Sequence, residues 1–130
     1  MDTTQRAPTK RVLLIDDMRS IRALVRVYLM NFGFTFDEAS DGAEGLVRLS
    51  EHPADLIIVD LLMAGMGGVE FLEHLRARPQ FAATPVIVLS ASLEEVAWRG
   101  AGEVGPTYRA AKPIEPAALK RIVQQALGAG

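Results

Sequence analysis

Four polar side chains in this 130-residue sequence stand directly after three short apolar runs: Asp16, Asp17, Asp60 and Ser90. Three carboxylates that lie within a few ångströms of one another repel, and a divalent cation with oxygen ligands removes that repulsion. Mg²⁺ takes octahedral oxygen ligands, usually one or two carboxylates with several waters, and leaves positions for phosphoryl oxygens. These residues therefore predict a magnesium site, provided that the fold brings them together.

Lys112 adds a cation to this set, immediately before Pro113. An ammonium group there can pair with a carboxylate or with a phosphoryl group. With the metal holding a phosphoryl donor in line, the Asp60 carboxylate can attack phosphorus and form an aspartyl phosphate. No general base is needed, because a carboxylate is already ionised.

The apolar runs that precede these polar residues predict buried parallel strands. The runs are continuous and rich in branched side chains, which is typical of strands covered on both faces: residues 12–15, 56–59 and 86–89. A weaker strand is expected over residues 35–39, and a short fifth strand over residues 108–111. All strands but the second end near a polar residue of the candidate site.

Helical periodicity fills the intervals between the strands. We expect a helix capped by Ser20 and stopped at Gly33, a helix capped by Asp41 that ends before Pro53, a helix over residues 68–77, and a last helix from Pro116 to about residue 127. A further helical segment is expected at residues 94–99, inside an irregular glycine-containing stretch.

Strands that alternate with helices at this spacing predict a three-layer α/β domain with a parallel sheet and right-handed crossovers. In such sheets ligands bind outside the carboxyl ends of the strands, where the strand order reverses. The candidate site residues should meet there. No repeat or linker interrupts residues 10–127, so we expect one domain at 10–127 and an N-terminal extension at 1–9.

Composition excludes several classes of protein. The net charge is −2 and the isoelectric point is about 5.7, which argues against a general nucleic-acid binder. The absence of cysteine removes disulfide scaffolds, thiolate zinc sites and thiol nucleophiles. The apolar runs are too short to span a membrane, and no secretion signal is evident, so we expect a cytoplasmic protein.

Four fragments in this order resemble the receiver domain of two-component response regulators: Val12-Leu13-Leu14-Ile15-Asp16-Asp17, Ile57-Ile58-Val59-Asp60-Leu61-Leu62-Met63, Val88-Leu89-Ser90-Ala91 and Ala111-Lys112-Pro113. The resemblance covers about residues 10–127. It implies a flavodoxin-like (βα)5 fold with a five-stranded parallel sheet in the order 2-1-3-4-5.

The resemblance also implies roles for individual residues. Asp60 would be the phosphoacceptor, and Asp16, Asp17, Asp60 and the backbone carbonyl of Leu62 would bind Mg²⁺. Lys112 would contact the phosphoryl group ahead of a cis bond to Pro113. Ser90 would follow the phosphoryl group in the activation switch.

A protein of this kind is a signalling switch rather than an enzyme, and it catalyses only its own phosphorylation and dephosphorylation. The resemblance implies a histidine kinase or phosphotransfer protein as donor and a downstream protein as target. We expect a stand-alone receiver that is a monomer or a weak dimer, with neither nucleic acid nor membrane as a partner.

The sequence departs from the receiver pattern at several positions. Arg109 stands where the family has a switch aromatic, and we hypothesise that it makes a polar switch contact. Tyr108 lies one place earlier, so it can substitute only if a bulge shifts the strand register. Ala64 and Gly67 replace residues usual in the loop after Asp60, and the glycine-rich segment 64–68 should be loose.

Leu62 and Ser92 flank the path of a water that would attack the acyl phosphate. Neither residue offers a carboxylate or an amide, so we expect slow self-dephosphorylation.

Two other classes of protein compete with this interpretation. A pseudo-receiver would bind partners without phosphorylation, as Arg109 and Ala64 suggest. A phosphatase that works through an aspartyl enzyme needs a second acid two residues after the nucleophile, where this chain has Leu62.

Overall fold

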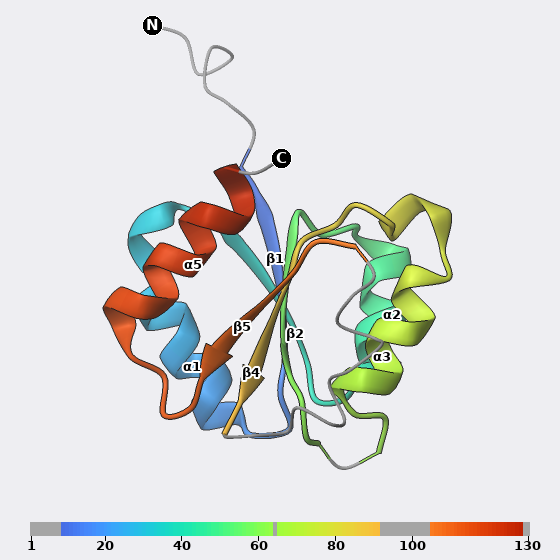
Figure 1. The fold of residues 1–130 in the computed structure, drawn as a ribbon, viewed down its shortest axis with the longest axis horizontal. Helices are drawn as coiled ribbons and strands as arrows, with labels where there is room; N and C mark the ends of the chain where they lie inside the picture. The colour runs from blue at the N-terminus through green and yellow to red at the C-terminus, as the bar shows by residue number, and fades with distance from the viewer. Residues whose placement is uncertain (1–8, 64, 92–104, 129–130) are drawn as a thin grey trace, which may run out of the picture.

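The computed structural model describes residues 9–63, 65–91 and 105–128. Figure 1 shows a twisted parallel sheet between two layers of helices, so the predicted three-layer α/β fold is confirmed. The strands are β1 (Arg11–Ile15), β2 (Thr35–Ala39), β3 (Leu56–Asp60), β4 (Val86–Ser90) and β5 (Thr107–Ala111). They pair in the predicted order β2-β1-β3-β4-β5.

The described helices overlap their predicted positions, but the first ends at Tyr28, and a separate 3₁₀ turn fills the stretch before Gly33. They are α1 (Arg19–Tyr28), α2 (Gly42–Glu51), α3 (Gly68–Arg76) and α5 (Pro116–Gly128), with short 3₁₀ turns η2 (Met30–Phe32) and η3 (Pro79–Phe81). The helix expected at residues 94–99 lies outside the described residues. Among the helices that the structure describes, none combines the length and apolar character needed to cross a membrane.

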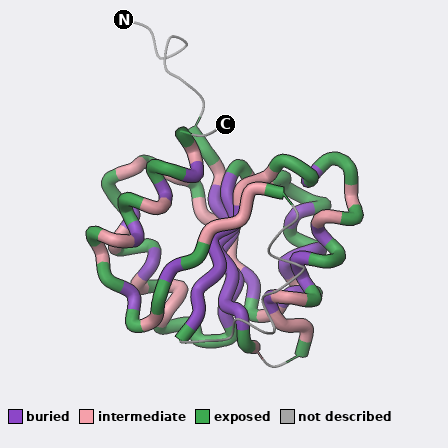
Figure 2. The backbone as a smooth tube through the Cα atoms, in the orientation of Figure 1, coloured by how far each residue is buried: buried purple, intermediate pink, exposed green. Residues whose placement is uncertain are grey.

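The central strands are covered on both faces. Every residue of β3 and β4 is buried, as are Val12 to Ile15 of β1, whereas the edge strands β2 and β5 are partly exposed (Figure 2). Burial on both faces explains why the central strands carry unbroken apolar runs instead of alternating polar and apolar residues.

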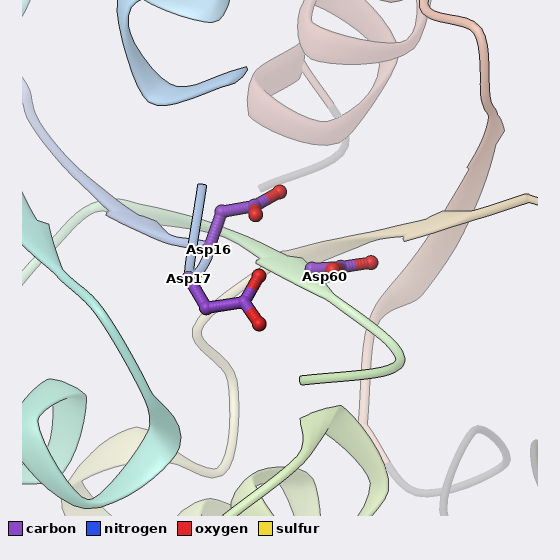
Figure 3. Close-up of side chains that lie close together, drawn as sticks. All are labelled: Asp16, Asp17 and Asp60. Carbon is purple, nitrogen blue, oxygen red and sulfur yellow. The ribbon is translucent and has the colours of Figure 1, made fainter. Parts of the chain in front are cut away.

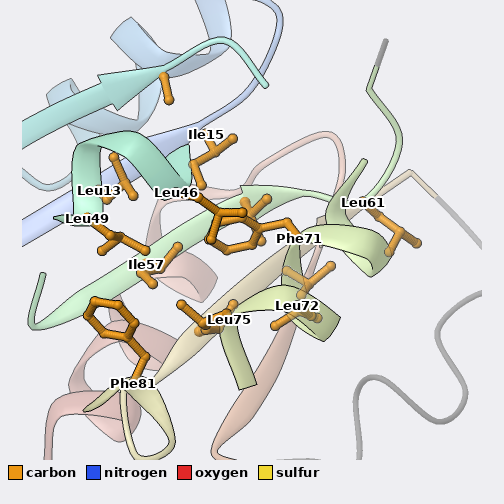
Figure 4. Close-up of a cluster of buried hydrophobic side chains, with 14 residues drawn as sticks. Leu13, Ile15, Leu46, Leu49, Ile57, Leu61, Phe71, Leu72, Leu75 and Phe81 are labelled. Atoms are coloured by element: carbon orange, nitrogen blue, oxygen red, sulfur yellow. The ribbon is translucent and has the colours of Figure 1, made fainter. Parts of the chain in front are cut away.

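Two apolar cores hold the layers together, one on each face of the sheet. Strand side chains alternate between them, so that Leu13 and Ile15 face the core under α2 and α3 while Val12 and Leu14 face the core under α1 and α5. Figure 4 shows the first core, in which Phe71 of α3 is fully buried. The two cores fix the sheet between its helices, and with it the edge where the strands end.

Three phenylalanines in and just before β2 are less deeply buried than Phe71. Phe32, Phe34 and Phe36 are half-buried against the core under α1 and α5. Phe32 stacks on Phe34 with 5.1 Å between ring centroids, and Phe34 meets Phe36 edge-on at 6.0 Å. They therefore close the margin of this core beside the edge strand β2.

One helix start is predicted correctly and another is wrong. The Asp41 carboxylate accepts a hydrogen bond from the backbone N–H of Glu44 at 2.8 Å and so caps α2. Ser20, the predicted cap of α1, lies inside that helix, whose N-cap is Met18. The turn before α1 is made instead by the Asp16 carboxylate, which accepts from the N–H of Met18 at 2.9 Å.

Candidate functional site

Three aspartates meet at the carboxyl edge of the sheet. Asp16 and Asp17 follow β1 and Asp60 ends the neighbouring strand β3, so paired parallel strands deliver them to one place. One carboxylate oxygen from each of the three lies within 4.8 Å of the others, and Figure 3 shows the side chains together at the strand ends. The structure thus assembles the acidic residues that the sequence singled out.

The three carboxylates differ in their exposure to solvent. Asp16 is 2% exposed and Asp60 is 7% exposed, whereas Asp17 is exposed. Asp16 and Asp60 therefore form the floor of the site, and Asp17 stands at its mouth. A ligand that enters from solvent meets one solvated and two desolvated carboxylates.

Lys112 joins the same cluster from the loop after β5. Its ammonium nitrogen lies 3.3 Å from Asp16 Oδ2 and 3.2 Å from Asp60 Oδ1, so one cation bridges the two buried acids. The backbone N–H of Lys112 donates to the Ser90 carbonyl at 2.9 Å, which ties this loop to the end of β4. The peptide bond between Lys112 and Pro113 is cis, as the resemblance implied.

The surroundings of Asp60 disfavour its ionised form. Burial raises the pKa of Asp60 above its usual range, and the charge of Asp16 raises it further. Lys112 and the backbone N–H of Leu62 act in the opposite direction without cancelling this effect. The site therefore holds more negative charge than its own groups neutralise.

This donor set fits a hard divalent cation. Three carboxylates within reach of a single ion are oxygen ligands of the kind that Mg²⁺ takes, and the exposed side of Asp17 leaves room for waters or a phosphoryl group. Such an ion would also relieve the repulsion between Asp16 and Asp60. The chemistry of the residues present is thus consistent with a magnesium site.

Ser90 lies on the neighbouring strand, at the end of β4. Ser90 is 5% exposed, and in the pairing of β4 with β5 it lies opposite Ala111. Leu89 of the same strand pairs with Asp60. The structure therefore places the Ser90 position beside the acid cluster, between Asp60 and the Lys112 loop.

The two residues considered for the switch lie on opposite faces of β5. The pairing with β4 runs without interruption from Thr107 to Ala111, so the strand contains no bulge. Tyr108 packs against the core under α1 and α5, whereas Arg109 is exposed. The bulge that Tyr108 would need in order to reach the other face is absent from this strand, and the switch contact of Arg109 stays a prediction.

The loop that follows Asp60 is tied to its surroundings through backbone groups. The N–H of Leu61 donates to the Leu89 carbonyl at 2.9 Å, and that of Gly68 donates to the Leu61 carbonyl at 2.9 Å. The N–H of Gly42, at the start of α2, donates to the Met66 carbonyl at 3.0 Å. The looseness expected of this segment stays a prediction, but these contacts anchor both of its ends.

Gly68 and Arg22 contribute to the site without having been singled out by the sequence. A Cβ at Gly68 would lie 2.6 Å from the Asp60 carbonyl oxygen, so only glycine lets α3 start so close to the acceptor strand. Arg22 donates from Nη1 to the Asp16 carbonyl oxygen at 2.5 Å. A glycine that opens a helix is a recognisable signal, whereas Arg22 stands among several arginines on the polar side of α1.

Comparison with known proteins agrees with this geometry. Residues 12–124 match the model of the response regulator receiver domain family. The chain is 30% identical over 120 residues to a probable chemotaxis protein CheY of Rhizobium etli, covering 92% of this chain and 93% of that protein. It is 36% identical over 106 residues to the transcriptional regulatory protein ResD of Bacillus subtilis, of which it spans only 43%.

Solved structures share the fold. Chemotaxis protein CheY4 of Vibrio cholerae superposes with a TM-score of 0.83 at 30% identity, covering 92% of this chain and all of that one. The receiver domain of the sensor histidine kinase PA1611 of Pseudomonas aeruginosa, described with a magnesium ion in its active-site cleft, has a TM-score of 0.82 at 22% identity, with 93% and 99% covered. With an acid cluster and a lysine gathered on this fold, the chain belongs to the response regulator receiver family of two-component signalling.

Proposed function

We propose that this receiver is a phosphorylation-dependent switch that accepts a phosphoryl group on Asp60, with Mg²⁺ as cofactor. One observation carries the proposal: Lys112 bridges Asp16 and Asp60 at 3.3 and 3.2 Å in a cluster that Asp17 completes. The magnesium ion described for the PA1611 receiver supports the choice of metal. The donor would be a histidine kinase or a phosphotransfer protein, whose phosphohistidine supplies the phosphoryl group.

In the transfer step a carboxylate oxygen of Asp60 forms a bond to phosphorus. The bond between phosphorus and the histidine nitrogen breaks, and its electron pair stays on that nitrogen. Asp16, Asp17 and Asp60, with the Leu62 carbonyl, would hold the metal, which when bound neutralises charge on the phosphoryl oxygens. Lys112 lies within reach of Asp60 Oδ1 and can pair with the same oxygens.

The signal would leave the site through Ser90 and β5. Ser90 lies beside the acceptor strand, and Arg109 is an exposed residue of β5 that pairs with Val88 of β4. We propose that a polar contact of Arg109 replaces the usual aromatic rotamer and changes the binding of a downstream protein. An R109A variant should then lose the effect of phosphorylation on partner binding, and unchanged coupling would reject this role.

A kinase as donor places the proposed switch in the cytoplasm, where it would act as a monomer or a weak dimer. Its own phosphorylation and dephosphorylation would be the only reactions that it catalyses. The competing function is a pseudo-receiver that binds its partner without phosphorylation. The exposed arginine at position 109 of β5, where the family has an aromatic, is the observation that favours it.

Beryllofluoride, which imitates a phosphoryl group on a carboxylate, separates the two functions. With Mg²⁺ present, it should raise the melting temperature of the wild-type protein and leave D60N unchanged. D55N is a matched control, because Asp55 precedes the same strand at its opposite end, where it accepts from the N–H of Arg11 at 2.7 Å. A pseudo-receiver would show no response in any of the three proteins.

A further inference from the structure

A half-buried arginine of α1, Arg22, contacts the backbone of the acid cluster. Arg22 is the fourth residue of α1, and its side chain is only 14% exposed. Its guanidinium donates from Nη1 to the Asp16 carbonyl oxygen at 2.5 Å and from Nε to Glu38 Oε1 at 2.7 Å. A planar guanidinium with two fixed donors is held in one orientation by two such partners.

Glu38 fixes that orientation from the edge strand β2. Its second oxygen accepts from Arg26 Nη1 at 2.6 Å, so the carboxylate stands between two arginines. Burial raises the pKa of Glu38, but the hydrogen bonds from Arg22 and Arg26 outweigh it and hold the pKa below the usual range. Glu38 is therefore ionised at neutral pH and remains a charged partner for Arg22.

The N–H, the carboxylate and the backbone carbonyl of Asp16 each contact different partners. Its N–H donates to the Ala39 carbonyl at 3.1 Å, and its carboxylate oxygens contact the Met18 N–H and the Lys112 ammonium. Arg22 contacts the remaining group, the backbone carbonyl. The N–H and the carboxylate of Asp16 are thus held by β2, by the turn at Met18 and by Lys112. Arg22 holds the peptide group that joins Asp16 to Asp17.

That peptide links the two metal-ligand candidates at the end of β1. Because a peptide bond is planar, the direction of the Asp16 carbonyl determines where the nitrogen and Cα of Asp17 lie. Asp17 is the next residue along the chain, so the direction of this peptide also sets the point from which its carboxylate extends. A rotation of this peptide would change the position of the Asp17 carboxylate relative to those of Asp16 and Asp60.

We propose that Arg22, oriented by Glu38, is a positioning residue that sets the peptide between Asp16 and Asp17 and so places the Asp17 carboxylate for the cation. This inference rests on the proposed magnesium site, which it deepens. Residues that orient metal ligands from outside the coordination sphere affect metal affinity by about 10–100-fold when they are mutated. Arg22 should act on the cation in this way, although it touches no candidate ligand atom of a side chain.

Arg26 provides a matched control within the same network. Both arginines lie on α1 and donate to Glu38, but only Arg22 also contacts Asp16. Arg26 is half-exposed and lies with its guanidinium carbon 5.4 Å from the centre of the Phe36 ring. R22Q and R26Q therefore each remove one ion pair with Glu38, and they differ in the contact to the Asp16 carbonyl.

The test is Mg²⁺ binding by isothermal titration calorimetry, repeated with Mn²⁺ by electron paramagnetic resonance, on wild type, R22Q and R26Q. We expect about tenfold weaker binding for R22Q and wild-type affinity for R26Q. R22K, which keeps a charge but has one donor group, should recover only part of the affinity. Melting temperatures in metal-free buffer report separately any general loss of stability from the broken ion pair.

Equal cation affinities for folded R22Q and R26Q would overturn the positioning role while leaving the proposed function intact. If the wild type itself bound neither cation, the proposed function would fail together with it. Should R22Q not fold, E38Q replaces it, because it leaves Arg22 in place but removes the charge that orients it. E38Q should then bind Mg²⁺ several-fold more weakly than R26Q, and equal affinities would again refute the role.

Discussion

Replacing Gly68 by alanine should displace the start of α3 from the acceptor strand. Gly68 is the first residue of α3, and its N–H donates to the Leu61 carbonyl at 2.9 Å. An added Cβ would lie 2.6 Å from the Asp60 carbonyl oxygen and 2.9 Å from the Leu61 Cα. Both atoms belong to the backbone of the chain that carries the phosphoacceptor, so no side chain can rotate to relieve the overlap.

The size of the effect follows from this geometry. The nearest contact lies about 1 Å inside the ordinary contact distance of about 3.5 Å. Overpacking of this kind costs about 1–3 kcal/mol, and any strain in the hydrogen bond to Leu61 adds to it. For a domain of this size each kcal/mol lowers the melting temperature by about 3–5 °C. Because the Asp60 backbone must move, Mg²⁺ affinity should fall as well.

Urea denaturation followed by far-ultraviolet circular dichroism measures the free energy of unfolding of G68A. G128A is the control, since a Cβ at Gly128, the last residue of α5, would meet no atom within 4 Å. Both variants replace glycine by alanine, so effects on the unfolded chain are similar in the two and largely cancel in the comparison. A free energy of unfolding for G68A within about 0.5 kcal/mol of that of G128A would refute the reasoning.

Three further predictions concern the ionisation of Asp60, the anchoring of β4 and β5, and the lifetime of the phosphorylated protein. Burial and the charge of Asp16 raise the pKa of Asp60 in the folded protein above its ordinary value of 3.8. At neutral pH the ionised Asp60 therefore lowers the free energy of unfolding. This destabilisation disappears as the pH falls below 3.8, where Asp60 is protonated in both the folded and the unfolded chain. In metal-free buffer D60N should therefore melt higher than wild type at neutral pH, with a difference that narrows on acidification; identical melting temperatures at neutral pH would contradict this. Arg76 donates to backbone carbonyls before β4 and β5, at 2.7 and 3.0 Å, so R76M should lower the free energy of unfolding by about 1.5–3 kcal/mol, and a change near zero in urea denaturation would count against it. Leu62, 58% exposed beside the acceptor, offers no polar group to an attacking water, so the phosphorylated protein should persist for minutes and L62Q should lose phosphate faster; loss within seconds in wild type would show the opposite.

The fold was predictable because strands that are buried on both faces appear in the sequence as continuous apolar runs. β3 and β4 are buried along their whole length, and this is why each reads as an unbroken apolar run. The polar residue at the end of each run then marked the carboxyl edge of the sheet. Asp60 and Ser90 could be assigned to that edge without any knowledge of contacts.

Supporting contacts of the site were not predictable in the same way. Ser20 has the right residue type for a helix cap, but the Asp16 carboxylate makes the turn earlier and α1 starts at Arg19. Arg22 reaches Glu38 across 16 positions of sequence, a pairing that depends on how α1 lies against β2. Such contacts follow from the packing of elements, which residue periodicity alone does not specify.

The register of β5 was predictable from the sequence only in part. Alternation predicted that Tyr108 and Arg109 face opposite sides of the strand, and the continuous pairing with β4 agrees with this. Whether a bulge would shift Tyr108 into the other face could be answered only by the hydrogen-bonded partner strand. The pairing of Val88 with Arg109 leaves the arginine at the exposed position.

The acceptor role of Asp60 is tested most directly by intact mass after incubation with a small phosphodonor such as acetyl phosphate and Mg²⁺. The wild-type protein should gain the mass of one phosphoryl group. D60A should gain none, and omission of Mg²⁺ should prevent the gain in wild type. An unchanged wild-type mass, or an equal gain in D60A, would contradict the assignment of Asp60 as the phosphoacceptor.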